Sequence, residues 1–320
     1  MEIKLKRFTG NPILKPTLNS WENKGVFNCG AAIFDNRILL LYRAQGNDNI
    51  SRFGLAFSDD GYTISDRLPD PIFVPDPDSE YEKLGVEDPR ISKIGDTYYI
   101  VYTAASLYPA VFTDVPEERP SGEIPWRIRL SVAHTRDFRS FDRHGVIVSH
   151  IDSKDGALFP ELVHDEMLLI HRVRPEIRLA VANDVNHFKE RGPIIGPRGS
   201  GWDSDLVGAG APPIKTPHGW VMIYHGVNDK HEYGLGLALI DPHDPLHILA
   251  RTEEPILTPE EAYEKVGIVN NVVFTCGAVK MGDELLVYYG AADKVIGVAS
   301  MPYRQLIDWA ALSYNSFHAR

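Results

Sequence analysis

The sequence of 320 residues is poor in cysteine, in long apolar runs and in excess positive charge. Two cysteines, Cys29 and Cys276, are too few for a disulfide scaffold or a cysteine-built metal site, and they agree with a reducing compartment. No window approaches the roughly 18 uninterrupted apolar residues that a membrane-spanning helix needs, so we expect no membrane partner. A formal net charge of −11 argues against general nucleic-acid binding, because such binding needs a basic face.

Two further absences narrow the choice. The first residues, MEIKLKRFTGNPIL, contain no apolar segment of the kind that marks a secreted protein, so we expect a cytoplasmic location. Histidine is frequent, with 12 residues, but no expected helix carries a His-x-x-x-His pair, and we therefore expect no metal. Glycine and proline are abundant, with 26 and 23 residues, which indicates a turn-rich globular protein.

A pattern of strands recurs five times along the chain. In each unit a short strand and a polar turn precede a very apolar strand, and a third strand follows. The apolar second strands are residues 37–44, 97–104, 167–173, 220–227 and 284–293. The markers Tyr42, Tyr102, His171, Tyr224 and Tyr288 give repeats of 60, 69, 53 and 64 residues. This period predicts an all-β fold, a five-bladed β-propeller that occupies residues 1–320 as a single domain. A β-sandwich is the alternative, because it too has many short strands.

Three segments depart from the repeat. Residues 259–265 are predicted to form a short helix, since proline stands in the first turn and acidic residues lie near its start. Residues 303–318 have an amphipathic pattern, and we expect the segment from about 303 to 320 to pack on the outside of the propeller. Residues 105–127 are rich in proline and aromatic residues. Three interpretations fit this segment: a loop that binds or covers a ligand, a solvated insertion, or a contact in a homo-oligomer.

An acidic pair opens the second unit. Glu87 and Asp88 are followed by Pro89, which cannot donate a ladder hydrogen bond and biases Asp88 away from helical angles, so these residues should lie where a strand starts. Taken alone the motif is weak, because Asp-Pro is common in turns and Arg90 can simply neutralise a nearby acid.

Polar residues should converge at the centre of such a propeller, where the first strands of all blades meet. The residues at these strand starts are Asn28, Asp88, Lys154 with Asp155, 208–210 and Thr275, and the second strands end near Arg43, Arg172, His225 and Asp293. An unpaired buried charge costs several kcal/mol, so these groups either pair to hold the blades together or surround a small polar ligand. Tyr42, Tyr102, Tyr224 and Tyr289 could offer ring faces to a sugar, but their spacing favours the core.

These residues resemble a known family, the β-mannoside phosphorylases of glycoside hydrolase family 130. The similar motifs run along nearly the whole chain, apart from residues 105–127 and the C-terminal end: FTGNPILKP, LLYRAQG, GVEDPR, KDGALFPE, LLIHR, GAGAPPIKT, YHGV, NVVFTCGA and VYYGAAD. The resemblance implies a five-bladed propeller that phosphorolyses β-mannosides with a lone catalytic acid, which falls on Asp88. It also implies that no cofactor is needed and that inorganic phosphate is the co-substrate.

The resemblance also assigns binding roles. Phosphate is already an anionic nucleophile, so a phosphorylase needs positive charges where an inverting hydrolase needs a base. Lys154, Arg172 and His225 match the family's phosphate ligands, which we expect to be a trio of positive groups. Asn28, Arg43 and Asp293 would hold the mannosyl unit. Arg90 and Asp155 complete the set of candidate substrate-binding residues.

One departure keeps alternatives open. Many relatives carry a lysine just ahead of the GAG segment, whereas this chain has Asp203 and Asp205 within residues 202–207. A carboxylate there would weaken phosphate binding and could act as a hydrolytic base, so an inverting β-mannosidase is one alternative. A noncatalytic carbohydrate-binding propeller is another. Because the three phosphate ligands remain, phosphorolysis is favoured, with the linkage, β-1,2 or β-1,4, and the acceptor left open.

Overall fold

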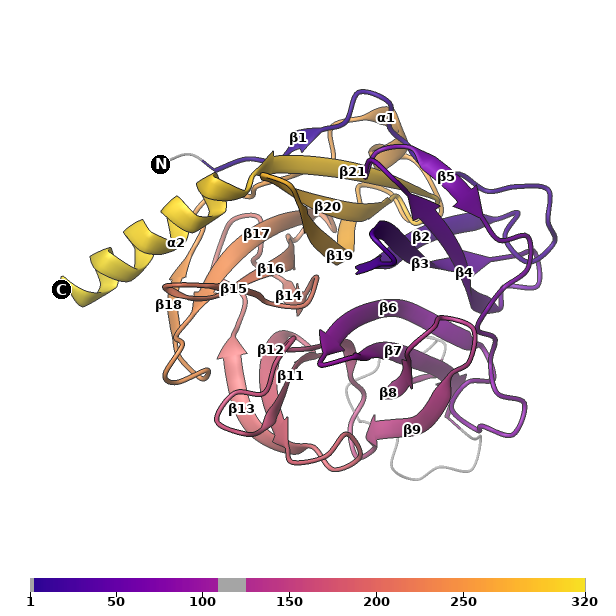
Figure 1. Cartoon of the computed structure of the whole chain (residues 1–320), viewed down its shortest axis with the longest axis horizontal. Helices are drawn as coiled ribbons and strands as arrows, with labels where there is room; N and C mark the ends of the chain where they lie inside the picture. Colours follow the sequence, from indigo (N-terminus) through magenta and orange to yellow (C-terminus); the bar gives the residue numbers. More distant parts are fainter. Residues whose placement is uncertain (1–2, 109–124, 320) are drawn as a thin grey trace.

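The computed structural model describes residues 3–108 and 125–319, and antiparallel strands dominate it (Figure 1). The predicted all-β class is confirmed. Two meanders, β2 to β5 and β6 to β9, join through one parallel pair, Ser51 with Gly85, into a single large sheet. Their strands are β2 (Gly25–Phe34), β3 (Arg37–Gln45), β4 (Ser51–Ser58), β5 (Ile64–Arg67), β6 (Gly85–Ile94), β7 (Thr97–Leu107), β8 (Trp126–Thr135) and β9 (Asp142–Val148).

Three more sheets follow, and they are the third, fourth and fifth meanders. The third is β10 (Lys154–Leu158), β11 (Met167–Val173), β12 (Glu176–Ala182) and β13 (Lys189–Ile195). The fourth is β14 (Leu206–Ala209), β15 (Ile214–Thr216), β16 (Gly219–Val227), β17 (Tyr233–Ile240) and β18 (Ile248–Arg251), with β14 and β15 both paired to β16. In the last sheet the first strand of the chain pairs with the last: β1 (Lys6–Arg7) lies beside β21 (Val295–Pro302). Strands β20 (Glu284–Ala291) and β19 (Val273–Met281) follow inward.

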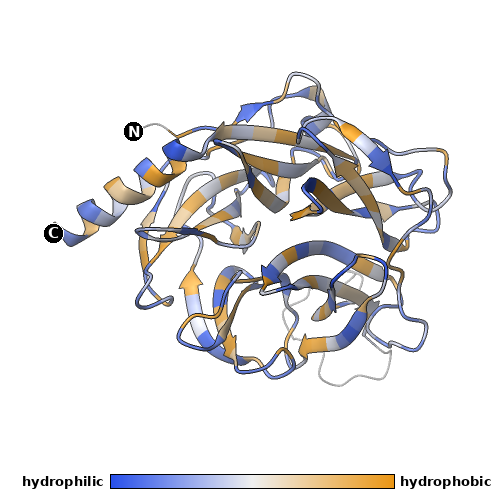
Figure 2. Cartoon of the chain, viewed as in Figure 1, coloured by the Kyte–Doolittle hydropathy of each residue, from blue (hydrophilic) through white to orange (hydrophobic). Residues whose placement is uncertain are grey.

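The sheets lie around a common centre, with β2, β6, β14 and β19 innermost (Figure 1). Strand β2 contacts β6 and β19, and β10 contacts β6 and β14. None of the sheets closes on itself. The middle strands of the meanders are largely apolar, whereas the outer strands β5, β9 and β13 and a stretch of the inner strand β6 are hydrophilic (Figure 2).

The predicted second strands and their turns are confirmed within a few residues. Asp35 and Asn36, between β2 and β3, have φ angles of 48° and 61°, as the tight turns of antiparallel hairpins require. Gly95 and Gly282 reach φ of 59° and 57° at equivalent turns. The loop predicted at 105–127 is shorter at both ends, because β7 and β8 include its first and last residues. Its central part, residues 109–124, lies outside the described residues.

A buried tyrosine, acid and arginine unit recurs in four of the five meanders. The tyrosine is on the second strand, the acid precedes the first strand, and the arginine is on the outermost strand. The units are Tyr42 with Glu22 and Arg67, Tyr102 with Glu82 and Arg143, Tyr224 with Asp203 and Arg251, and Tyr289 with Glu264 and Arg7. The hydroxyl-to-carboxylate distances are 3.0, 2.7, 2.9 and 2.9 Å. The four rings are therefore core residues and offer no face to a sugar.

This unit corrects the fifth marker of the repeat. Tyr289, not Tyr288, is equivalent to the other markers, since its hydroxyl donates to the acid Glu264. Adjacent residues of a strand point to opposite faces, and Tyr288 instead donates to the carbonyl of Gly61 in the first meander, at 2.8 Å. Two neighbouring tyrosines made the sequence ambiguous by one position.

Both predicted helical segments are present. The short one, α1 (Ala262–Lys265), begins with a capping box. The Glu261 side chain accepts from the backbone amide of Glu264, and the Glu264 side chain accepts from the backbone amide of Glu261. The long one, α2 (Tyr303–His318), packs against the sheets through Leu306, Trp309 and Ala310 and extends beyond them at its C-terminal end (Figure 1). Neither helix, nor any other in the described part of the chain, is long and apolar enough to cross a membrane.

Candidate active site

Strained backbone positions place the polar side chains at the centre. Asn28, Asp88 and Asp155 have φ angles of 48°, 52° and 55°, in the left-handed region that asparagine and aspartate tolerate better than most residues. Each lies at a register shift, where β2, β6 and β10 carry extra residues relative to their neighbours. Asp293, in the turn after β20, has φ of 53°. Such positions cost about 1–3 kcal/mol each and gather at functional sites.

Asp88 is the centre of one charge cluster. Its Oδ1 accepts from Asn28 Nδ2 at 2.9 Å and from Arg43 Nη1 at 3.1 Å, and the side chain is buried. Arg43 Nη2 also donates to Glu87 Oε1 at 2.6 Å, so one guanidinium group bridges both carboxylates. Burial raises the pKa of Asp88, but the charges of Arg43, Lys154 and Arg90 outweigh it and hold the pKa below its usual value. The carboxyl group is therefore ionised in the ligand-free protein.

Asp155 is the centre of a second cluster. Its Oδ2 lies 3.1 Å from Arg172 Nη1 and 3.5 Å from His225 Nε2, and its Oδ1 lies 3.3 Å from Arg90 Nη2. Burial alone would raise the pKa of Asp155, but Arg172, His225 and Arg90 lower it far below the usual range. Three of the predicted site residues, Arg90, Arg172 and His225, therefore lie within 3.5 Å of the Asp155 carboxylate.

Arg90 links the two clusters from behind. Its guanidinium group donates to the carbonyls of Asp88, Ala209 and Gly210 as well as to Asp155, and only 1% of the residue is exposed. These four bonds use four of its five N–H groups, and the guanidinium group is buried.

The expected trio of positive groups is a pair. Burial lowers the pKa of His225 to about 3, against the opposing effect of Asp155, and the imidazole is neutral at physiological pH. Lys154 and Arg172 carry the positive charge. The Lys154 ammonium makes no hydrogen bond or ion pair with residues 3–108 or 125–319, although it is close enough to lower the pKa values of Glu87 and Asp88.

Several buried polar atoms at the centre have no hydrogen-bond partner among the described residues. They are Asn28 Oδ1, Thr103 Oγ1 and His225 Nδ1. Buried polar atoms are almost always satisfied in folded proteins, so orphans that gather at one place indicate where a polar ligand binds. No group of three or more His, Cys, Asp or Glu residues in the described ranges is arranged to hold a metal ion.

Asp293 completes the arrangement on the Arg43 side. Burial raises its pKa to about 6, which the cation of Arg43 opposes and the charge of Asp88 reinforces. Burial likewise raises the pKa of Glu87, against the effect of Arg43. The centre therefore contains carboxyl groups with pKa values pushed in opposite directions, as in sites of acid catalysis.

A hydrogen-bonded chain that runs from buried Ser153 to exposed Glu190 supports the positive side of the site. Ser153 Oγ lies 2.7 Å from His171 Nδ1, and His171 Nε2 lies 3.0 Å from Glu190 Oε2. Ser153 directly precedes Lys154, and His171 directly precedes Arg172. The chain thus ties the backbone of both cationic residues to the outer strand β13.

This arrangement can be compared with known proteins. A family model described as beta-1,4-mannooligosaccharide phosphorylase, that of glycoside hydrolase family 130, matches residues 4–118 and 121–312. The chain belongs to glycoside hydrolase family 130.

Relatives within family 130 cover almost the whole chain. A 1,2-beta-oligomannan phosphorylase of Thermoanaerobacter sp. (strain X514) is 39% identical over 95% of this chain and 99% of its own length. The solved β-1,2-mannobiose phosphorylase from Listeria innocua, in complex with β-1,2-mannobiose, has a TM-score of 0.82 at 27% identity, and the match covers 96% of this chain and 99% of that one. A structure from a study of family 130 hydrolases that target β-1,2 mannosidic linkages in Candida mannan has a TM-score of 0.84 at 25% identity, over 95% of both chains.

Three residues of the centre were missing from the predicted set of this family 130 chain. Glu87 shares Arg43 with Asp88, Thr103 contributes an orphan hydroxyl, and Gly208 lies so close that an added Cβ would be 2.4 Å from His225 Nε2 and 2.5 Å from Asp155 Oδ2. A signal for Thr103 was available, because it follows Tyr102 just as Arg43 follows Tyr42. The strand repeat had already placed Gly208 at the centre, within 208–210, but with no role assigned to it.

Proposed function

We propose that this family 130 chain phosphorolyses β-mannosides with inversion and releases α-mannose 1-phosphate. The observation that carries the proposal is the combination of a buried carboxylate, Asp88, with two cationic side chains, Lys154 and Arg172, at one centre. A catalytic acid with nearby positive charge suits a reaction whose nucleophile is already an anion.

We also propose that the five meanders are the blades of a single propeller domain over residues 1–320. The contacts of β2 with β6 and β19, of β10 with β6 and β14, and of β16 with β19 support this arrangement. It would explain why residues from 28 to 293 surround one point.

In the proposed reaction a phosphate oxygen attacks the anomeric carbon from the face opposite to the glycosidic oxygen. The carbon–oxygen bond to the leaving sugar breaks, and the leaving oxygen takes a proton from Asp88, directly or through a hydroxyl group of the bound mannosyl unit. The products are α-mannose 1-phosphate and the shortened mannoside. Lys154 and Arg172 hold the phosphate, and neutral His225 takes part as a hydrogen-bonding ligand through its unpartnered Nδ1.

Asp88 must be protonated to act as the acid, and phosphate itself supplies the means. The cations that hold the pKa of Asp88 down include Lys154, one of the proposed phosphate ligands. A bound phosphate adds negative charge beside Lys154 and cancels part of its field, so the pKa of Asp88 rises in the loaded site. Binding of phosphate should therefore favour protonation of Asp88, and protonation of Asp88 should favour binding of phosphate.

The mannosyl unit is assigned to the Arg43 side. Asn28 Oδ1 is free to accept from a sugar hydroxyl, and Gly290 leaves room for it, because an added Cβ there would lie 2.1 Å from that oxygen. Arg43 and Asp293 offer a donor and an acceptor beside it. We assign the β-1,2 linkage, since the oligomannan and mannobiose phosphorylases reported above carry that linkage in their names.

Hydrolysis with inversion is the second candidate, favoured by the likeness to the β-1,2-mannoside hydrolase structure. It needs a base, and the acids ahead of Gly208 were the candidates. Asp203 Oδ2 is fully buried and bound by Tyr224 and Arg251, and Asp205 lies 3.6 Å from Arg174. Neither carboxylate contacts Asp88 or Lys154 within the described ranges, so phosphorolysis fits the geometry better.

The test incubates the protein with β-1,2- and β-1,4-mannobiose, with and without phosphate. Phosphorolysis predicts mannose 1-phosphate from the β-1,2 substrate only when phosphate is present. Equal release of free mannose in both conditions would establish hydrolysis, and binding without any product would establish a carbohydrate-binding protein. Reverse synthesis from mannose 1-phosphate with a panel of acceptor sugars then identifies the acceptor.

A further inference from the structure

An ion pair joins the third meander to the fourth. Arg174 follows β11 and Asp205 precedes β14, and Arg174 Nη2 lies 3.6 Å from Asp205 Oδ2, outside the usual range of a hydrogen bond. Ion pairs of this kind contribute little to stability at a protein surface, so the position of the pair decides whether it has another role. We call it the entrance pair.

The backbone places the entrance pair just beyond two of the proposed phosphate ligands. Arg174 is two residues beyond Arg172, in the turn between β11 and β12. The amide of Asp205 donates to the carbonyl of Val227 at 2.9 Å, and Val227 is two residues beyond His225 at the end of β16. A strand rises about 3.4 Å per residue, so the entrance pair is anchored roughly 7 Å beyond the two ligands.

A further backbone bond ties Arg174 to the centre. The amide of Val207 donates to the carbonyl of Pro175, the neighbour of Arg174, at 3.0 Å. Val207 directly precedes Gly208, the glycine at which an added Cβ would lie 2.4 Å from His225 Nε2. The turn that carries Arg174 is therefore bonded to the strand that lines the phosphate side of the centre.

Exposure to solvent increases from the ligands to the entrance pair. The side chain of His225 is fully buried and that of Arg172 is 12% exposed, whereas the side chains of Asp205 and Arg174 are 37% and 72% exposed. The entrance pair thus lies on the solvent side of the ligands. Phosphate that reaches the centre from this side meets Arg174 before it meets Arg172.

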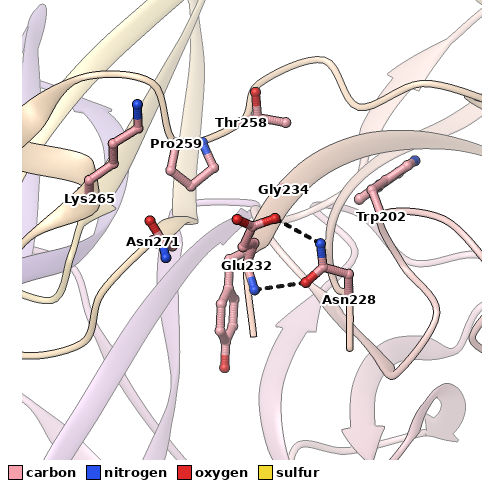
Figure 3. A pocket seen from close by; sticks show the side chains of 9 residues that line it. Trp202, Asn228, Glu232, Gly234, Thr258, Pro259, Lys265 and Asn271 are labelled. Carbon is pink, nitrogen blue, oxygen red and sulfur yellow. Dashed lines mark hydrogen bonds between the residues drawn. The ribbon is translucent and has the colours of Figure 1, made fainter. Parts of the chain in front are cut away.

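Asp205 is the fixed partner of the pair and Arg174 is the movable one. Beyond Val227 the β16–β17 hairpin is held by Asn228, whose Oδ1 accepts from the amide of Glu232 at 3.0 Å and whose Nδ2 donates to Glu232 Oε2 at 2.9 Å (Figure 3). The Asp205 backbone is bonded to this hairpin. The exposed arginine side chain, by contrast, has many rotamers and is long enough to fold back over two residues of its strand.

The charge of the molecule gives such an arginine a task. The centre is rich in carboxyl groups and the whole chain has a formal net charge of −11, so an approaching phosphate ion is repelled. The guanidinium fork of arginine matches two phosphate oxygens and forms charge-assisted hydrogen bonds with them. A phosphate dianion also carries twice the charge of a carboxylate, and it therefore competes with Asp205 for Arg174.

We propose that Arg174 leaves Asp205 to bind inorganic phosphate at the entrance and becomes the third cation of the loaded site, beside Lys154 and Arg172. The inference rests on the proposed function and adds to it a residue that recruits the co-substrate. Asp205 holds the arginine outside the centre while phosphate is absent. The two partners should therefore have opposite effects, because Arg174 favours phosphate binding and Asp205 opposes it.

The test measures kcat/KM for inorganic phosphate with saturating β-1,2-mannobiose. Arg174→Met keeps most of the side-chain stem and removes the charge, and it should lower this kcat/KM about fivefold, the effect of one charge roughly 7 Å from a dianion across solvent. Asp205→Asn releases the arginine and should raise the same kcat/KM about fivefold. Salt shortens the range of such interactions to about 3 Å at about 1 M, so both differences should fall below about twofold there. The KM for mannobiose should stay within about twofold in both variants.

Arg191→Met is the matched control. Arg191 pairs with Glu166 at 3.5 Å, and the two side chains are 51% and 34% exposed, much as in the entrance pair. Glu166 precedes β11 and lies at the end of that strand opposite to Arg172, so the control should leave all constants within about twofold. The proposal is overturned if Arg174→Met behaves like the control, if Asp205→Asn lowers kcat/KM for phosphate as Arg174→Met does, or if the loss in Arg174→Met persists at about 1 M salt.

Phosphate-dependent turnover of mannobiose by the unaltered protein tests the proposed function separately. If that turnover is absent, calorimetric titration of the three variants with inorganic phosphate decides on the entrance pair alone. Weaker binding by Arg174→Met and tighter binding by Asp205→Asn than by Arg191→Met support the role of Arg174, and equal binding by all three refutes it.

Discussion

Replacing Asp88 by asparagine should remove the acid and leave the site otherwise in place. Asparagine tolerates the φ of 52° at this position. Its side-chain oxygen can still accept from Asn28 and Arg43, which lie 2.9 and 3.1 Å from Asp88 Oδ1 in the unaltered protein. The fold and the affinity for substrate should therefore change little. The proton for the leaving oxygen is lost, and general acid catalysis of this kind contributes about 10²–10⁴-fold.

The expected loss in kcat on β-1,2-mannobiose is thus about 10²–10⁴-fold, or roughly 3–5.5 kcal/mol of transition-state stabilisation. A β-mannoside with a dinitrophenolate leaving group needs no proton, so Asp88→Asn should phosphorolyse it at a rate close to that of the unaltered protein. Release of mannose 1-phosphate measures the first substrate, and dinitrophenolate absorbance measures the second.

Glu87→Gln is the matched control, because Glu87 is the adjacent carboxyl group and shares Arg43. Its loss should affect both substrates alike, since it alters the position of Arg43 and not the proton supply. The reasoning about Asp88 is refuted if Asp88→Asn slows both substrates to the same extent, or if Glu87→Gln shows the dependence on the leaving group instead.

Four further changes test other parts of the structure. Gly208→Ala forces a methyl group to within 2.5 Å of Asp155 and should lower the rate of phosphorolysis about a hundredfold. The control Gly199→Ala should have no effect, because an added Cβ there meets nothing within 4 Å. Equal activities of the two variants would contradict the close approach at Gly208. His171→Ala breaks the chain behind Lys154 and should raise KM for phosphate several-fold with less effect on KM for mannobiose; a change in kcat alone would exclude a positioning role. Tyr42→Phe removes one partner of a buried acid and should lower the free energy of unfolding in urea by about 1–2 kcal/mol. Because burial raises the pKa of Asp293 to about 6 from about 3.9 in the unfolded chain, the stability it contributes is complete below pH 4 and declines as pH rises through 6. Asp293→Asn should therefore gain stability relative to the unaltered protein at pH 7.5 but not at pH 3.5, and the same difference at both values would contradict the shifted pKa.

The strand pattern was predictable because burial and turns leave direct marks in the sequence. Apolar runs such as 97–104 and turn residues such as Asp35 and Asn36 require only local rules, and they gave the five second strands within a few residues. The charge state of His225 was not predictable. It depends on complete burial beside Arg172 and Arg90, which come from different meanders, and no local pattern records that.

The same reasoning explains which site residues could be inferred. Asn28, Asp88 and Asp155 stand at equivalent positions at the starts of inner strands, so the repeat placed them together before any geometry was known. The hydrogen bonds of Arg90 to the carbonyls of residues 209 and 210, more than a hundred positions away, could not be inferred from the sequence. The sequence suggested only that Arg90 neutralises a nearby acid or binds the substrate.

The repeated unit also accounts for the way chemistry is distributed around the centre. On each second strand the residue before the site position is held by a buried acid or hydroxyl group, as Tyr42 is by Glu22 and His171 is by Ser153. Neighbours on a strand point to opposite faces, so the following residue faces the other way, free of that bond. Arginine, threonine, histidine and glycine occupy the equivalent following positions. The fixed residue keeps the strand in place while its neighbour varies, which allows five similar units to build one asymmetric site.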